Sequence, residues 1–149
     1  GLRGDLIERY KSSLANGGFK HLIDNGTYYT NAHYQHANTE TIVGHTTLAT
    51  GAQPSSHGMV GNVWYDSNTG EIGYNIEDPL APILPTRTHT VEGVQVDPAQ
   101  KASRTKGRSP RSILGSTIAE EIFNASDGKA KVFGVSGKDR RAVSMAVTK

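Results

Sequence analysis

Residues 39–46 read TETIVGHT, and this stretch decides how the rest of the chain is interpreted. The sequence predicts a short helix over 42–50, because Gly51 follows as a stop signal, and Thr41 stands at the N-terminal edge of that helix. A hydroxyl there meets the first unpaired backbone N–H groups and the positive end of the helix dipole. Such a junction favours a phosphate or sulfate group and a nucleophile held beside it, whereas the plainer alternative makes Thr41 only a helix cap.

Two further polar stretches carry groups that suit phosphoryl oxygens. Residues 61–66 read GNVWYD, in which the side-chain amide of Asn62 can donate to a non-bridging oxygen, although asparagine is also common in turns. Residues 136–141 read SGKDRR, in which Lys138 and Arg140 would project to one side if the backbone stays extended. Together they suit a doubly charged phosphate, with arginine as a fork and lysine as a point charge, and the alternative is a solvated run of charges.

The predicted elements alternate between helices and strands. Helices are expected over 2–14, 19–24 and 109–122, the last with Ser109 as its cap and Pro110 at its first position, and with a stop at 127–128. Strands are expected at 27–34, at 64–66 and 71–76 as a hairpin, and at 131–136, an apolar run typical of a buried, parallel strand. This order predicts an α/β architecture.

Composition limits the classes of function. The chain has 149 residues and a mass of 16.0 kDa, the size of one domain over 1–149. A formal net charge of only +2 argues against nucleic-acid binding, and no apolar run approaches the roughly 20 residues that span a bilayer. The absence of cysteine excludes disulfides, thiolate metal sites and a cysteine nucleophile, and the six histidines form no assembled zinc site.

Residues 79–111 form a long irregular excursion. They hold five of the six prolines and a run of basic residues. Excursions of this length are usually functional or mobile. Two interpretations stay open at this point, a solvated surface loop and a basic lid that faces the substrate.

Taken together and in order, these motifs resemble the alkaline phosphatase superfamily, in its threonine-nucleophile branch of type I phosphodiesterases/nucleotide pyrophosphatases and PafA-like alkaline phosphatases. The matching stretches are 2–6 (LRGDL), 41–45 (TIVGH), Thr50-Gly51, Pro54, His57-Gly58, 61–66 (GNVWYD) and 138–140 (KDR). The interval of 21 residues from Thr41 to Asn62 agrees with the family's spacing between nucleophile and asparagine. The resemblance implies part of a three-layer α/β sandwich with a mostly parallel sheet.

The resemblance also implies a role for each site residue. Thr41 is then the nucleophile, its oxygen bound by a metal ion and carrying a covalent phosphoryl intermediate. Asn62 holds a phosphoryl oxygen, while Lys138 and Arg140 stabilise the remaining charge, which matters most for dianionic monoesters. The sulfatase branch is less suitable, because the chain lacks the Cys/Ser-x-Pro-x-Arg sequence that formylglycine formation requires.

Departures from the family pattern concern the metal. Family members bind two zinc ions with Asp and His ligands spread over a much longer chain. The first of these ligands would precede Gly1, and the others would follow residue 149. The expectation is therefore an N-terminal portion of the catalytic domain, inactive or nearly so by itself, whose parent protein is periplasmic or secreted.

Three functions stay open on the sequence alone. The first is a phosphomonoesterase-like hydrolase, and the second is a phosphodiesterase, nucleotide pyrophosphatase or phosphonate hydrolase of the same superfamily. The third is a non-catalytic module that binds anions or oligomerises. The expected ligand is a phosphate ester, or a phosphate or sulfate anion. A homo-oligomer is also expected, because a sheet without its first strand exposes an edge or a core face.

Overall fold

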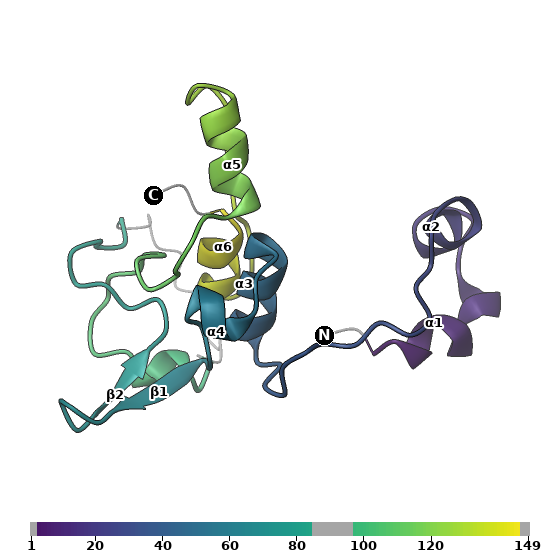
Figure 1. The fold of residues 1–149 in the computed structure, drawn as a ribbon. Coiled ribbons are helices and arrows are strands. Elements are labelled where there is room, and N and C mark those ends of the chain that lie inside the picture. Colours follow the sequence, from purple (N-terminus) through teal and green to yellow (C-terminus); the bar gives the residue numbers. More distant parts are fainter. Residues whose placement is uncertain (1–2, 85–96, 147–149) are drawn as a thin grey trace, which may run out of the picture. The chain divides into compact units, whose positions relative to one another are not determined.

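The computed structural model describes residues 3–84 and 97–146, and the chain divides into two compact units, residues 1–34 and 35–149 (Figure 1). The first unit contains α1 (Asp5–Arg9), the 3-10 helix η1 (Lys11–Ser13) and α2 (Phe19–Asn25). The helix predicted over 2–14 is therefore interrupted, since Tyr10 leaves helical geometry with φ −109° and ψ 16°. The stop of the next helix at Asn25 and Gly26 is confirmed.

The second unit holds the remaining elements. They are α3 (Thr41–Thr50), α4 (Pro54–His57), β1 (Val63–Asp66), β2 (Glu71–Tyr74), the 3-10 helix η2 (Gln100–Ala102), α5 (Ile118–Ala125) and α6 (Asp139–Met145). Figure 1 shows α3 beside α6, and these two helices pack against each other. The helix predicted over 42–50 is confirmed, and it ends as expected at Gly51, whose φ of 66° is the left-handed conformation that glycine adopts without strain.

The hairpin predicted at 64–76 is confirmed. Strands β1 and β2 are antiparallel, with Val63 opposite Tyr74 and Asp66 opposite Glu71. The turn closes through Gly70, whose backbone N–H donates to the Asp66 carbonyl oxygen over 2.8 Å. In this register Val63, the residue after Asn62, lies opposite Tyr74, so the beginning of β1 is beside the end of β2.

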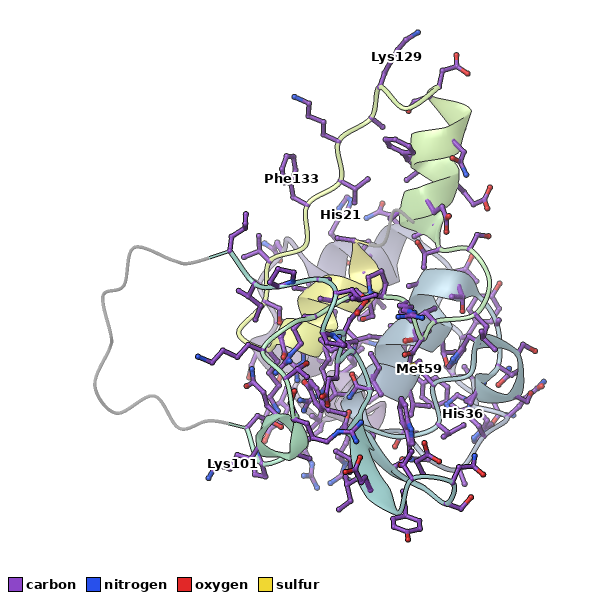
Figure 2. All side chains as sticks on the ribbon, turned by 90° about the vertical axis from the view of Figure 1, so that its left-hand side faces the viewer. His21, His36, Met59, Lys101, Lys129 and Phe133 are labelled. Carbon is purple, nitrogen blue, oxygen red and sulfur yellow. The ribbon has the colours of Figure 1, made fainter. Side chains whose placement is uncertain are left out.

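Among the described residues, an apolar cluster joins α3 and α6 to the hairpin of β1 and β2. Its buried members are Ile42, Val43, Met59, Tyr74, Ile76 and Ile113, and Trp64, Ala99 and Val143 pack against it. Met59, labelled in Figure 2, lies among the packed side chains and is fully buried. Because α3 and α6 both contribute to this cluster, their N-terminal ends are fixed to one small core.

The α/β class is confirmed, but the expectation of a mostly parallel sheet is wrong for the residues that the structure describes. Their sheet consists of β1 and β2 alone, which are antiparallel. Neither 27–34 nor 131–136 is a strand, because a strand requires a neighbour that supplies hydrogen bonds and no described residue pairs with them. The segment 131–136 is extended, and Phe133 and Val135 are 82% and 96% exposed (Figure 2).

The helix predicted to begin at Ser109 begins later. Its first residue is Ile118, and the Thr117 hydroxyl caps it by accepting from the Glu120 backbone N–H. Ser109 instead donates its hydroxyl to Asp78 over 2.6 Å. Gly115, between Ser109 and the start of α5, has a φ of 82° and is therefore not helical. The predicted stop at 127–128 is confirmed, because Asp127 and Gly128 both have positive φ.

The described parts of the excursion over 79–111 are 79–84 and 97–111, and residues 85–96 lie outside the described residues. Its basic residues are not all free to face a substrate. Arg104 pairs with Glu71 and Glu77, and Arg108 pairs with Asp139. Within residues 3–84 and 97–146, no helix is long and apolar enough to cross a membrane.

Candidate functional site

The N-terminus of α3 carries Thr41 as its first residue. The preceding residue, Glu40, provides no side-chain cap. Ile42 and Val43, which follow Thr41, are fully buried and anchor this turn in the core. Among the described residues, no hydrogen-bond partner is found for the Thr41 hydroxyl or for the backbone N–H groups of Thr41 and Val43. The turn therefore presents a hydroxyl beside unpaired donors at the positive end of a helix.

Asn62 supplies the cap that Glu40 does not. Its side-chain oxygen accepts from the Ile42 backbone N–H over 3.1 Å. Its own backbone is fixed on both sides, because its N–H donates to Glu40 Oε2 over 2.5 Å and its carbonyl oxygen accepts from Asn75 Nδ2 over 2.5 Å. The structure thus places Asn62 against the first turn of α3, which begins at Thr41. The Nδ2 group of Asn62 has no partner within the described part of the chain.

Lys138 and Arg140 lie at the N-terminus of α6, and both bind Asp97. Arg140 forms a two-armed pair with it, at 3.1 Å from Nη1 to Oδ1 and 3.1 Å from Nη2 to Oδ2. Lys138 Nζ lies 2.5 Å from Oδ2 of the same carboxylate. The expectation of a continuous extended backbone is wrong, since Lys138 is extended but Arg140 belongs to the first turn of the helix. The two side chains nevertheless meet on one anion.

The two cations differ in exposure. The Lys138 side chain is 37% exposed, whereas the Arg140 side chain is 2% exposed. Burying a guanidinium requires a paired anion, and Asp97 supplies it. In turn, the Arg140 guanidinium, with the ammonium of Lys138, holds the pKa of Asp97 well below its usual range. Asp97 is therefore an anion whenever the unit is folded near neutral pH.

A second group of polar and charged side chains, which includes Tyr74 and Asp139, also contacts Arg140. Arg140 Nη1 donates to the Tyr74 hydroxyl over 3.4 Å, and that hydroxyl donates to Asp139 Oδ1 over 2.6 Å. Asp139 Oδ2 accepts from Arg108 Nε over 2.8 Å, and the Arg108 guanidinium lies 5.0 Å from the centre of the Tyr74 ring. Burial raises the pKa of Tyr74 to about 12, and the hydrogen bond to Asp139 contributes.

This network is the part of the site that the sequence did not predict. Asp97 and Asp139 are ordinary acidic residues in their local sequence, and they lie 41 residues before Lys138 and next to it, respectively. Only the fold shows that Asp97 binds both cations. Residues 138–140 hold two basic residues and one acidic residue, so their local sequence gives no sign that a distant carboxylate binds both cations.

His57 stabilises α3 through its contact with Thr47. Its Nδ1 accepts from the Met59 backbone N–H over 3.1 Å, so the proton of the neutral ring is on Nε2, 3.0 Å from the Thr47 hydroxyl. Burial lowers the pKa of His57. Among residues 3–84 and 97–146, no group of three or more His, Cys, Asp and Glu side chains is arranged to hold a metal ion.

Comparison with known proteins gives a consistent result. The family model described as type I phosphodiesterase / nucleotide pyrophosphatase matches residues 1–135. The chain is 34% identical over 143 residues to alkaline phosphatase PafA of Elizabethkingia meningoseptica, covering 95% of this chain and 23% of that protein. It is 31% identical over 142 residues to alkaline phosphatase PhoV of Synechococcus elongatus, covering 95% of this chain and 23% of that protein.

Solved structures agree with the sequence relatives. The crystal structure of wild-type PafA superposes with a TM-score of 0.79 at 32% identity, covering 97% of this chain and 25% of that one. A PafA variant with one threonine, one asparagine, one lysine and one arginine substituted superposes with the same TM-score of 0.79 at 30% identity. The chain therefore spans about a quarter of the length of the relatives that it matches.

Proposed function

The chain belongs to the type I phosphodiesterase / nucleotide pyrophosphatase family of the alkaline phosphatase superfamily, and on this premise we propose that it supplies the nucleophile and the phosphoryl-binding side chains of a phosphomonoesterase-like hydrolase. The proposed nucleophile is Thr41. The proposed phosphoryl-binding residues are Asn62 and Lys138, and Arg140 adds its positive charge without touching the ligand. Because the chain covers only about a quarter of its relatives, we propose that the parent enzyme, and not these residues alone, carries out turnover.

One observation carries the proposal, the capping of α3 by Asn62. Its oxygen is used by the Ile42 N–H, so its Nδ2 donor stays available beside the unpaired hydroxyl of Thr41. A hydroxyl and an amide donor at a helix N-terminus are the arrangement that a phosphoryl group requires, since one attacks phosphorus while the other binds a non-bridging oxygen.

The spacing of these residues supports the assignment. In the substituted PafA variant, the threonine and the asparagine are 21 residues apart, as Thr41 and Asn62 are here. The lysine and the arginine of that variant are two residues apart, as Lys138 and Arg140 are. The interval between the two pairs differs, at 62 residues in that variant and 76 in this chain.

In the proposed reaction, the Thr41 oxygen attacks phosphorus and its proton leaves. The bond from phosphorus to the ester oxygen breaks, and the alcohol departs with a proton. Water then attacks the phosphothreonine, which releases inorganic phosphate and restores the hydroxyl. The α3 N-terminus, the Asn62 amide and the Lys138 ammonium stabilise the negative charge on the phosphoryl oxygens. Arg140 is buried, and it contributes its charge from behind Lys138.

Two zinc ions are the cofactor expected in the parent enzyme. The described residues do not fit such a pair, because they contain no cluster of His, Cys, Asp or Glu side chains suited to a metal ion. Thr41 would offer one oxygen to a metal held by other ligands.

The decisive experiment is a chimera in which this chain replaces the matching quarter of PafA. We expect hydrolysis of p-nitrophenyl phosphate, and the Thr41→Ala variant should lose activity by at least about a thousandfold. The matched control is Thr69→Ala, which removes an exposed hydroxyl in the turn after β1. Equal activity of the Thr41→Ala and Thr69→Ala chimeras would show that Thr41 is not the nucleophile.

A phosphodiesterase or nucleotide pyrophosphatase is the second candidate, and the description of the matching family favours it. A phosphonate hydrolase of the superfamily would give the same pattern. The comparison of p-nitrophenyl phosphate with bis-p-nitrophenyl phosphate on the chimera separates the candidates. Lys138→Ala should reduce monoester hydrolysis more than diester hydrolysis if Lys138 faces a dianion.

A non-catalytic, oligomerising module is the third candidate. The extended segment 131–136 exposes Phe133 and Val135, and apolar side chains of this size at a free strand-like edge favour pairing with another chain. Light scattering should then show an oligomer for this chain. Replacement of both residues by serine should give a monomer, while a monomeric parent chain would exclude this candidate.

A further inference from the structure

The charge offered by the anion-binding residues is smaller than their sequence suggests. Lys138 and Arg140 carry two positive charges, and Asp97 contacts both cations with its carboxylate. The formal charge of the three side chains together is +1. A phosphoryl group that approaches Lys138 therefore meets the negative charge of Asp97 immediately behind the ammonium.

We infer that Asp97 is a specificity-determining residue, which sets how strongly the site distinguishes a dianionic phosphate monoester from a monoanionic diester. This inference rests on the proposed function of Lys138 as a phosphoryl-binding residue. Asp97 has both oxygens occupied, Oδ1 by Arg140 and the Ala99 backbone N–H and Oδ2 by Arg140 and Lys138. Its side chain is 15% exposed, so water screens its charge only in part.

Because Arg140 holds Asp97 in place, the negative charge of Asp97 stays beside Lys138 when a ligand binds. Arg140 is 2% exposed and donates to Asp97 and to the Tyr74 hydroxyl, so it does not leave Asp97 to meet a ligand. Tyr74 is in turn held by Asp139, which Arg108 pairs. Lys138 alone has exposed surface with which to contact an anion, and its ammonium can donate to Asp97 and to a phosphoryl oxygen at the same time.

Coulomb's law then predicts a quantitative signature. The repulsion between Asp97 and a bound ligand is proportional to the charge of the ligand. The free energy by which Asp97 weakens binding of a dianion is therefore twice that for a monoanion at the same place. The factor by which Asp97 lowers the affinity for a dianion is therefore the square of the factor by which it lowers the affinity for a monoanion.

The test is calorimetric titration of the full chain with two probes, inorganic phosphate at pH 8.5 as the dianion and dimethyl phosphate as the monoanion. Asp97→Asn keeps the size of the side chain and one acceptor for Arg140, and it removes the negative charge. We expect the variant to bind dimethyl phosphate about threefold and phosphate about tenfold more tightly than the parent chain. The matched control, Asp127→Asn, removes an exposed carboxylate beyond α5 and should leave both affinities unchanged.

Several outcomes would overturn the inference. Unchanged or weaker phosphate binding by Asp97→Asn would mean that Asp97 only positions or folds the site, and an equal gain for both anions would exclude a Coulombic origin. If Asp97→Asn does not fold, Asp97→Ser replaces it, and the gain in affinity for phosphate must again be about the square of the gain for dimethyl phosphate.

Lys138→Ala distinguishes this failure from failure of the proposed function. If Lys138→Ala removes phosphate binding while Asp97→Asn does not strengthen it, the inference alone is wrong. If neither the parent chain nor Asp97→Asn binds phosphate, the inference and the assignment of the phosphoryl-binding residues are both wrong. Lys129→Ala, a change in an exposed lysine after α5 (Figure 2), controls for the loss of one positive charge.

Discussion

The N-terminus of α3 and the N-terminus of α6 both carry residues that the sequence predicts to bind a phosphoryl group, and they are built from different interactions. At α3, the free donors are neutral, since the hydroxyl of Thr41 and the amide nitrogen of Asn62 have no partner among the described residues, while the Glu40 carboxylate beside them accepts from the Asn62 backbone N–H. At α6, charged groups meet, and Lys138 and Arg140 are already bound to Asp97.

This difference shows two ways in which a protein can hold groups that could bind an anion. Neutral donors stay available without a counter-ion, because leaving them facing solvent costs little. Buried cations require a counter-ion to be folded at all, because an uncompensated charge in the interior is strongly unfavourable. The donors at α3 are therefore free, whereas at α6 one of the two positive charges is balanced by Asp97.

The largest expected effect is on stability at α6. Arg140→Ala should lower the free energy of unfolding by about 3–5 kcal/mol, because it leaves Asp97 without its buried partner. Lys138→Ala removes a partly exposed cation from the same carboxylate and should cost less than about 1 kcal/mol. Urea unfolding followed by circular dichroism measures both. Similar costs for the two variants would show that α6 is not closed in the way described.

The next effect is alkaline destabilisation through Tyr74, which belongs to the α6 network. Its pKa is raised from 10.0 to about 12, so the folded state holds the phenolic proton more tightly than the unfolded state does. The resulting stability is fully present below pH 10 and is lost as the pH rises to 12, in total about 2–3 kcal/mol.

Unfolding measured at several pH values from 9 to 12 checks this prediction. Tyr74→Phe should flatten the alkaline decline, while Tyr29→Phe, at a 77% exposed position, should not. An alkaline decline of the same size in all three proteins would show that another group causes it.

At α3, two substitutions of Asn62 should have different effects on stability and on phosphate binding. Asn62→Ala leaves the Ile42 N–H without its acceptor and should cost about 1–2 kcal/mol. Asn62→Asp keeps an acceptor oxygen and should preserve most of that stability, but it replaces the free amide donor by a negative charge. Phosphate binding, measured by calorimetry, should therefore be lost in Asn62→Asp even though the protein is as stable as the parent.

The smallest effect is acid sensitivity at α3. Burial lowers the pKa of His57 below 6.5, so the unfolded state takes up a proton more readily. Stability is therefore fully present above pH 6.5 and is lost as the pH falls through the lower pKa of the folded state. Protonation also abolishes the acceptor that the Met59 N–H uses.

Melting temperatures between pH 7.5 and 5.5 measure this acid sensitivity. His57→Gln should melt at a lower temperature at pH 7.5 and show a weaker dependence on pH. His21→Asn, in the first unit and labelled in Figure 2, is the control and should keep the dependence of the parent chain. A parent chain whose melting temperature does not fall in acid would contradict the role of His57.

Local sequence was sufficient where a short-range signal determines structure. Gly51 ends α3, the turn at 67–70 sets the hairpin, and the α/β class follows from the order of elements. The selection of Thr41 and Asn62 came from their combined resemblance to a family and not from either residue alone. The assignment of roles to Thr41, Asn62, Lys138 and Arg140 is still a prediction.

Local sequence was insufficient where a partner far along the chain decides the outcome. The apolar run at 131–136 has strand-like composition, but a strand forms only when another strand lies alongside it. The charges at 138–140 are those of a free basic patch until Asp97 is placed against them. Gly134 shows the same dependence, since a Cβ atom there would collide with the Ala142 carbonyl oxygen of α6.

The contact between Tyr74 and α6 has a consequence for the order of events on the ribosome. The hydrogen bonds from Tyr74 to Asp139 and from Arg140 to Tyr74 join residues 65 and 66 positions apart. The hairpin and α3 therefore emerge during synthesis well before the helix that covers them. Until about residue 145 has left the exit tunnel, α3 lacks its contacts with α6 and the core cluster lacks Val143, so this unit stays incompletely packed even after the hairpin has formed.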